Sequence, residues 1–149
     1  MRRASCTSRT GGPDRRLIAV VALERDALVV ACAISAGIHA ALTPSHSAES
    51  TGAGLGFATA AVLLAGLVVA LTVHPYGALA VVGAAAVLAG LVASYARLPL
   101  FHPEPEQVDG LALGTKGIEA VGLLAAAHLL RPDRAAFALT AMQSRGRTT

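Results

Sequence analysis

Four long apolar stretches, separated by short polar segments, dominate the sequence. Each is within the range of about 17–25 residues that crosses the hydrocarbon core of a bilayer as an α-helix, and the first is at the lower limit of that range. The predicted spans are residues 27–43, 55–73, 78–96 and 111–130. The pattern therefore predicts an all-α fold: an integral membrane four-helix bundle in up-down-up-down order with short connections.

Three consecutive charged residues, 24–26, set the start of the first span, because such a run does not sit in hydrocarbon. The apolar residues 17–23 are expected to form an interfacial turn of the same helix. Thr43 and Pro44 are expected to end the span, with Pro44 in the first position of a short surface helix. A cleaved signal peptide is the weaker alternative, because the charges interrupt its apolar region.

Polar segments flank this apolar region at both ends. Residues 1–16 are rich in Arg and are expected to form a disordered cytoplasmic tail. Residues 132–149 form a second cytoplasmic tail in this interpretation. The transmembrane domain is predicted to occupy residues 17–131 between them.

Composition agrees with lipid rather than water as the surrounding solvent. Of the 149 residues, 54% are hydrophobic and only 14% are charged, whereas soluble domains carry about 25% charged residues. Aromatic residues are 3% of the chain and Trp is absent. Small residues suit a membrane bundle, because they let helices approach closely.

The distribution of charge predicts the orientation. Ten of the eleven Arg residues lie in residues 1–25 or after residue 130, and the remaining one is Arg97. Positive residues are retained on the cytoplasmic side of spanning helices. Both termini are therefore expected in the cytoplasm, with the chain in the plasma membrane. The lipid bilayer explains the basic tails better than nucleic acid does.

Two charged residues interrupt the fourth span. Lys116 is the only lysine of the chain, and Glu119 follows it three residues later on the same helical face. A lone ionised carboxylate in hydrocarbon costs several kcal/mol, so Glu119 is expected to be paired, protonated or hydrated. Lys116 and Arg97 are its expected charge partners. The pair is either a packing device or an ion or proton site.

Histidines and acids cluster toward the predicted outer face. His39 lies about one helical turn from the outer end of the first span, and His46 and Glu49 follow it. Neutral imidazoles with a carboxylate are ligands that suit Zn²⁺ or Cu²⁺. The alternative is that His39 hydrogen-bonds a neighbouring helix and His46 is an ordinary surface residue.

His74 and His128 lie toward the predicted inner side, on the second and fourth spans, and two facing histidines can hold a haem. No GxSxG, P-loop or HExxH motif is present, so the sequence gives no support for soluble-type catalysis.

Two motifs resemble those of an uncharacterised family of small four-span membrane proteins of actinobacterial type. Residues 36–39 and 43–49 resemble its pattern aGxH…aPEHxxE, and residues 97–108 with Glu119 resemble R…LPxGPxPExV…E. Ser45 replaces the Glu of the first pattern, and His102 replaces a Gly of the second. The resemblance implies no known activity, but it draws attention to the residues His39, His46, Glu49, Arg97 and Glu119.

Three functions remain open at this point. The first is a small-ion or transition-metal binding or transport-related protein with a polar site toward the outer face. The second is a structural or accessory subunit that forms homo-oligomers or joins a membrane complex. The third is a haem-bearing electron-transfer subunit.

Overall fold

The computed structural model describes residues 13–74, 77–95 and 110–132, and this part of the chain is all-α without a strand. Its four helices are α1 (Pro13–Glu49), α2 (Thr51–Val73), α3 (Ala78–Tyr95) and α4 (Gly110–Leu129). The predicted all-α class is confirmed. The bounds of α2, α3 and α4 follow the second to fourth predicted spans closely.

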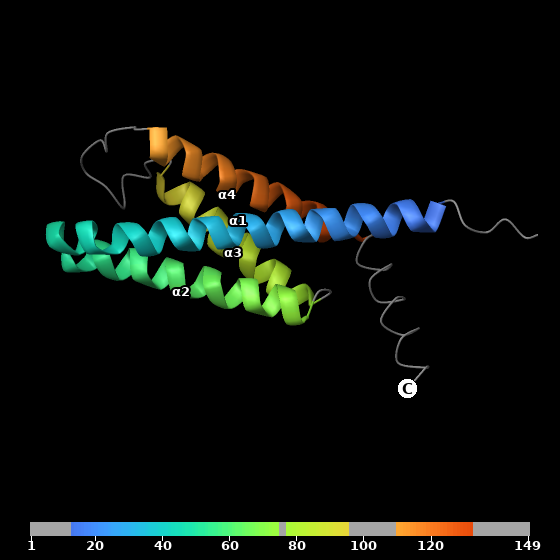
Figure 1. The fold of residues 1–149 in the computed structure, drawn as a ribbon, viewed down its shortest axis with the longest axis horizontal. Helices are drawn as coiled ribbons and strands as arrows, with labels where there is room; N and C mark the ends of the chain where they lie inside the picture. The colour runs from blue at the N-terminus through green and yellow to red at the C-terminus, as the bar shows by residue number, and fades with distance from the viewer. Residues whose placement is uncertain (1–12, 75–76, 96–109, 133–149) are drawn as a thin grey trace, which may run out of the picture.

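The four helices form a bundle in which α1 packs against α2 and α4 (Figure 1). α3 packs against α4 and, less extensively, against α2. The first residue of α1 and the last of α4 lie toward the same end of the bundle, which we call the terminal end (Figure 1). The opposite end holds the α1–α2 connection at Ser50 and is called the hairpin end.

α1 is longer than the predicted first span. Its 37 residues begin at Pro13, run through Pro44 and end at Glu49, about 55 Å in all. Pro44 lacks the N–H that would bond the carbonyl four residues earlier, but nearby hydroxyls bond other carbonyls of this region. Thr43 donates to the carbonyl of His39 and Ser47 to that of Thr43, both at 2.8 Å. α1 nevertheless runs through Pro44 to Glu49, beyond the residue where the span was expected to end.

A single residue connects α1 to α2. Ser50 has an extended backbone and caps α2 by accepting a hydrogen bond from the Ala53 amide at 3.0 Å. Just beyond it the two helices touch, because a Cβ added to Gly54 would lie 2.8 Å from Ser47 Cα. The short connection and this glycine hold α1 and α2 as a tight antiparallel pair.

The interior of the bundle is built from small and medium side chains at helical spacing. The buried residues of α1 between positions 28 and 39 are Leu28, Ala31, Cys32, Ser35, Ala36 and His39. The buried residues of α4 are Thr115, Glu119, Gly122 and Ala126. Both stripes are apolar toward the terminal end and polar toward the hairpin end, so packing α1 on α4 brings their polar residues together.

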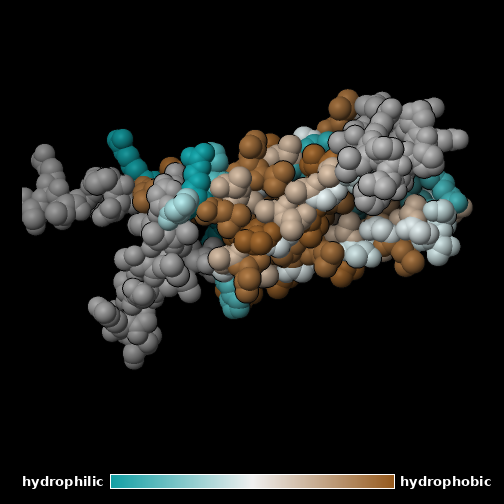
Figure 2. Space-filling view, turned by 180° about the vertical axis from the view of Figure 1, so that it is seen from behind, coloured by the Kyte–Doolittle hydropathy of each residue, from teal (hydrophilic) through white to brown (hydrophobic). Residues whose placement is uncertain are grey.

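Much of the apolar surface faces outward. α2 and α4 are each long and apolar enough to cross a membrane, and only 22% and 28% of their apolar windows are buried. The apolar segment Ala78–Ser94 of α3 is shorter. Large side chains such as Val62 and Leu79 are exposed. On the face seen in Figure 2, hydrophobic surface covers the middle of the bundle, and hydrophilic residues gather toward its two ends.

Candidate functional site

A buried polar cluster lies between α1 and α4 in the half of the bundle toward the hairpin end. It consists of Ser35 and His39 on α1 and Glu119 on α4. Ser35 and Glu119 have no exposed surface, and His39 is 6% exposed. Ser35 and His39 are four residues apart and so share one face of α1. Glu119 lies near the middle of α4 and faces them.

The two carboxylate oxygens of Glu119 have different partners. The Ser35 hydroxyl donates to Oε1 at 2.9 Å, and the Lys116 ammonium donates to Oε2 at 2.7 Å. His39 Nε2 lies 3.9 Å from Oε1. The predicted pairing of Lys116 with Glu119 is thus present, and the carboxylate is also joined to two residues of α1.

The second nitrogen of His39 fixes the state of its ring. His39 Nδ1 lies 2.8 Å from the backbone carbonyl oxygen of Ser35. A carbonyl oxygen can only accept, so Nδ1 carries a hydrogen in this bond. In the neutral ring Nε2 is then the bare nitrogen. This bare nitrogen is the one that faces the Glu119 carboxylate.

Lys116 joins a third helix to the cluster. Its ammonium donates to the backbone carbonyl of Leu91 in α3 at 3.1 Å as well as to Glu119. The lysine side chain is 20% exposed. The cluster therefore ties α1, α3 and α4 together, and it places a positive charge beside a carboxylate that has no contact with solvent.

A second group of polar residues lies on α1 nearer the hairpin end. His46 Nδ1 lies 3.2 Å from Glu49 Oε2, and the Glu49 side chain is 70% exposed. Phe57 of α2 contacts both imidazoles: its ring is stacked on His46 at 4.0 Å and tilted against His39 at 5.3 Å. An aromatic ring thus adjoins both the exposed acid–imidazole pair and the buried cluster.

The predicted metal set divides between these two groups. His46 contacts Glu49, whereas His39 joins Glu119. Within the described ranges, no three His, Cys, Asp or Glu side chains gather as a metal site requires. Arg97, the other expected partner of Glu119, lies outside the described residues. The Zn²⁺ or Cu²⁺ hypothesis stays a prediction from the sequence.

The two histidines considered for haem have other surroundings. His128 Nδ1 lies 3.3 Å from Glu24 Oε1 of α1. His74 is exposed and occupies the C-cap of α2, where its amide donates to the carbonyl of Ala70. The structure therefore joins His128 to an acid on α1.

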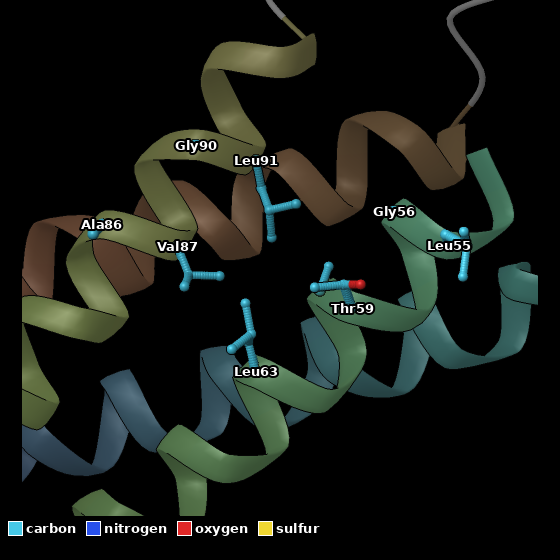
Figure 3. Close-up of a pocket in the computed structure, with 9 residues that line it drawn as sticks. Leu55, Gly56, Thr59, Leu63, Ala86, Val87, Gly90 and Leu91 are labelled. Carbon is cyan, nitrogen blue, oxygen red and sulfur yellow. The ribbon is translucent and has the colours of Figure 1, made fainter. Parts of the chain in front are cut away.

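A lateral groove of about 440 Å³ runs between α2 and α3 (Figure 3). Leu63, Val87 and Leu91 project into it, and Thr59 supplies the hydroxyl group of its lining (Figure 3). Leu91 also contacts the polar cluster, because its backbone carbonyl accepts a hydrogen bond from Lys116. The lining suits hydrocarbon, so a polar ligand gains little from this groove.

Sequence reasoning identified His39, Lys116 and Glu119, but it missed Ser35, Phe57 and the contact of Glu24 with His128. Ser35 is uncharged and does not stand out in an apolar run. Its spacing of four residues from His39 is the signal that could have found it. The Phe57 and Glu24 contacts join different helices, so no spacing along the chain indicates them.

No family model, curated protein or solved structure matches this chain.

Proposed function

We propose that the chain is a multi-pass protein of the plasma membrane, with four transmembrane helices and both termini in the cytoplasm. Large exposed apolar side chains and the low burial of α2 and α4 support this, because soluble monomers rarely expose such extensive apolar surface. The Arg-rich ends of the chain support the orientation. The terminal end of the bundle then faces the cytoplasm, and the hairpin end faces outward.

Within that membrane the chain has a small-ion function: it transports protons through the buried cluster. The main support for this proposal is the distance of 3.9 Å between His39 Nε2 and Glu119 Oε1. Nδ1 of the same ring is already bonded to the Ser35 carbonyl. Two groups that can each hold a proton face one another in a dry interior. Intramembrane acids with an imidazole partner are the usual components of proton relays.

A proton fits this cluster better than Zn²⁺ or Cu²⁺ does. A transition metal needs several neutral or anionic donors around one point. Here one carboxylate oxygen already binds the Lys116 ammonium, and a cation beside it would repel a divalent metal. Elemental analysis of the detergent-purified protein tests the metal alternative, and stoichiometric Zn or Cu would favour it over the proton.

The proposal is tested in liposomes that contain the purified protein and a pH-sensitive dye, under a potassium diffusion potential. Wild-type protein should change the internal pH faster than protein-free liposomes. Glu119→Gln and His39→Gln should each lower this flux by at least about tenfold, because each removes a proton-holding group. Glu49→Gln, at a largely exposed carboxylate, is the matched control.

A second measurement reads the proton itself. Infrared difference spectra after a pH jump should contain the C=O band of a protonated carboxylic acid, shifted in Glu119→Asp and lost in Glu119→Gln. Wild-type flux equal to that of empty liposomes, together with no such band, would reject the proposal.

A structural or accessory subunit is the second candidate, because the same cluster joins α1, α3 and α4. In that case Glu119→Gln lowers the free energy of unfolding, or weakens self-association or association with a membrane partner, and no proton flux is found in the wild type. Denaturant titration and size-exclusion chromatography in detergent measure these losses, and the absence of wild-type proton flux separates this candidate from the first.

A further inference from the structure

A second acid–imidazole pair lies at the terminal end of the bundle, between the same two helices. Glu24 of α1 and His128 of α4 approach to 3.3 Å. The Glu24 side chain is 15% exposed and that of His128 is 48% exposed. The pair therefore lies where the packed α1–α4 interface opens to solution. The two helices supply opposite groups in the two pairs. α1 provides the imidazole of the buried cluster and the carboxylate of the second pair, and α4 provides the other group of each.

A layer of closely packed apolar side chains separates the two pairs. Glu119 and His128 are nine residues apart on α4, about 13 Å along the helix axis. Between them α4 packs tightly on its neighbours, since a Cβ on Gly122 would lie 2.8 Å from Ala31 Cβ and 2.9 Å from Leu88 Cδ1. Leu28 in the same layer has no exposed surface. Titratable pairs thus lie on both sides of an apolar constriction.

We infer that Glu24 and His128 form a second proton-binding site, which exchanges protons between the Glu119–His39 site and the cytoplasmic solution. This inference rests on the proposed function and adds the inner half of the route. An imidazole can accept a proton on one nitrogen and release one from the other, and its partial exposure gives His128 access to solution. The apolar layer keeps the two sites disconnected in this arrangement of the helices.

The step transfers only a proton. The transfer requires water in the apolar layer, and the proton moves along that water from Glu119 or His39. It then binds the Glu24 carboxylate or His128, and it leaves from the imidazole to solution. No oxidant, reductant or further reactant is needed.

Other charged groups at this end have different surroundings. Arg25 and Asp26 on α1 form an ion pair with each other. Arg131 follows α4 and is exposed, and His74 is exposed at the end of α2. These neighbours supply matched controls: Asp26→Asn for the acid and His74→Gln for the imidazole.

The test measures dye-reported proton flux in liposomes for Glu24→Gln, His128→Gln and the double variant. The proton flux of each single variant should be at least about tenfold lower than that of the wild type. The double variant should lose no more than either single one, because the two residues act as one site. The exchanged variant Glu24→His with His128→Glu should restore flux, because it keeps one acid and one imidazole at the site. A purely structural contact gives no reason to expect this recovery of flux.

The outcomes separate this inference from the proposed function. If Glu119→Gln abolishes flux while Glu24→Gln and His128→Gln leave it at the level of Asp26→Asn and His74→Gln, the inner site is wrong and the buried site stands. If the Glu24 and His128 variants lose flux and Glu119→Gln does not, the buried site is wrong. Wild-type protein without flux overturns both. Helical circular dichroism and a single elution peak confirm that each variant is folded.

Discussion

Glu119 is the fully buried acid at the centre of the polar cluster. Its carboxylate has no exposed surface, and its oxygens accept bonds from Ser35 and Lys116. Burying a charge is costly unless an opposite charge and hydrogen bonds compensate it. Lys116 provides the charge and the Leu91 carbonyl holds the ammonium in place. Ser35, Lys116 and Leu91 come from α1, α4 and α3, so the surroundings of this one carboxylate depend on how three helices pack.

Removing the lysine should therefore be more harmful than removing the pair. Lys116→Met leaves Glu119 buried without its counter-charge and should lower the free energy of unfolding by about 3–5 kcal/mol. The double variant Lys116→Met with Glu119→Gln should recover much of this loss, because no buried charge remains. Denaturant titration in mixed micelles measures both. Equal stability of the wild type and Lys116→Met would show that the pair is not a stabilising contact.

The helix sequences differ in how clearly their pattern indicates which face points into the bundle. α2 is apolar on nearly every side, so its sequence gives no stripe that marks the core. α1 and α4 carry polar residues at spacings of three and four, and these positions face each other. Small residues then decide how closely the helices approach. Gly122 is the clearest case, because it meets both Ala31 of α1 and Leu88 of α3.

Two glycines of α4 give a matched test of this contact. Gly122→Ala adds a methyl group 2.8 Å from Ala31 Cβ and should lower the free energy of unfolding by about 1–3 kcal/mol. Gly117→Ala meets nothing within 4 Å and should be neutral or stabilising by up to about 1 kcal/mol, because Ala favours helix more than Gly does. Denaturation midpoints that order the two variants the other way would contradict the close approach of α1, α3 and α4.

At the scale of the whole molecule, the face seen in Figure 2 has hydrophobic surface over the middle of the bundle and hydrophilic residues toward its two ends. Apolar surface of this kind suits a bilayer, in which apolar side chains need no cover. The polar groups of the buried cluster bond one another and the Leu91 carbonyl of α3.

Cysteine labelling tests the orientation in a background with Cys6→Ser and Cys32→Ala. Ser50→Cys, at the hairpin end, should react with a membrane-impermeant maleimide on intact cells. His74→Cys, near the terminal end, should react only after permeabilisation, as expected for helices that alternate in direction. The background without cysteine is the control. Reaction of both on intact cells, or protein that stays in the supernatant after high-speed centrifugation without detergent, would reject the membrane topology.

The sequence alone determined the all-α class, the approximate bounds of α2, α3 and α4, and the pairing of Lys116 with Glu119. These follow from local rules: apolar length, helix-breaking residues and a spacing of three residues on one helix. It did not predict that α1 would continue through Pro44, because by local rules a proline usually ends or kinks a helix.

Only the tertiary structure decided that Ser35 and His39 would meet Glu119, 84 residues after Ser35 in the chain. It likewise joined Glu24 to His128 and set Phe57 against two imidazoles. These contacts depend on how each helix is rotated about its axis and on which helices are neighbours. Close packing of small residues sets both, and in helices that are apolar on almost every side, hydrophobic patterning carries too little information to reveal either.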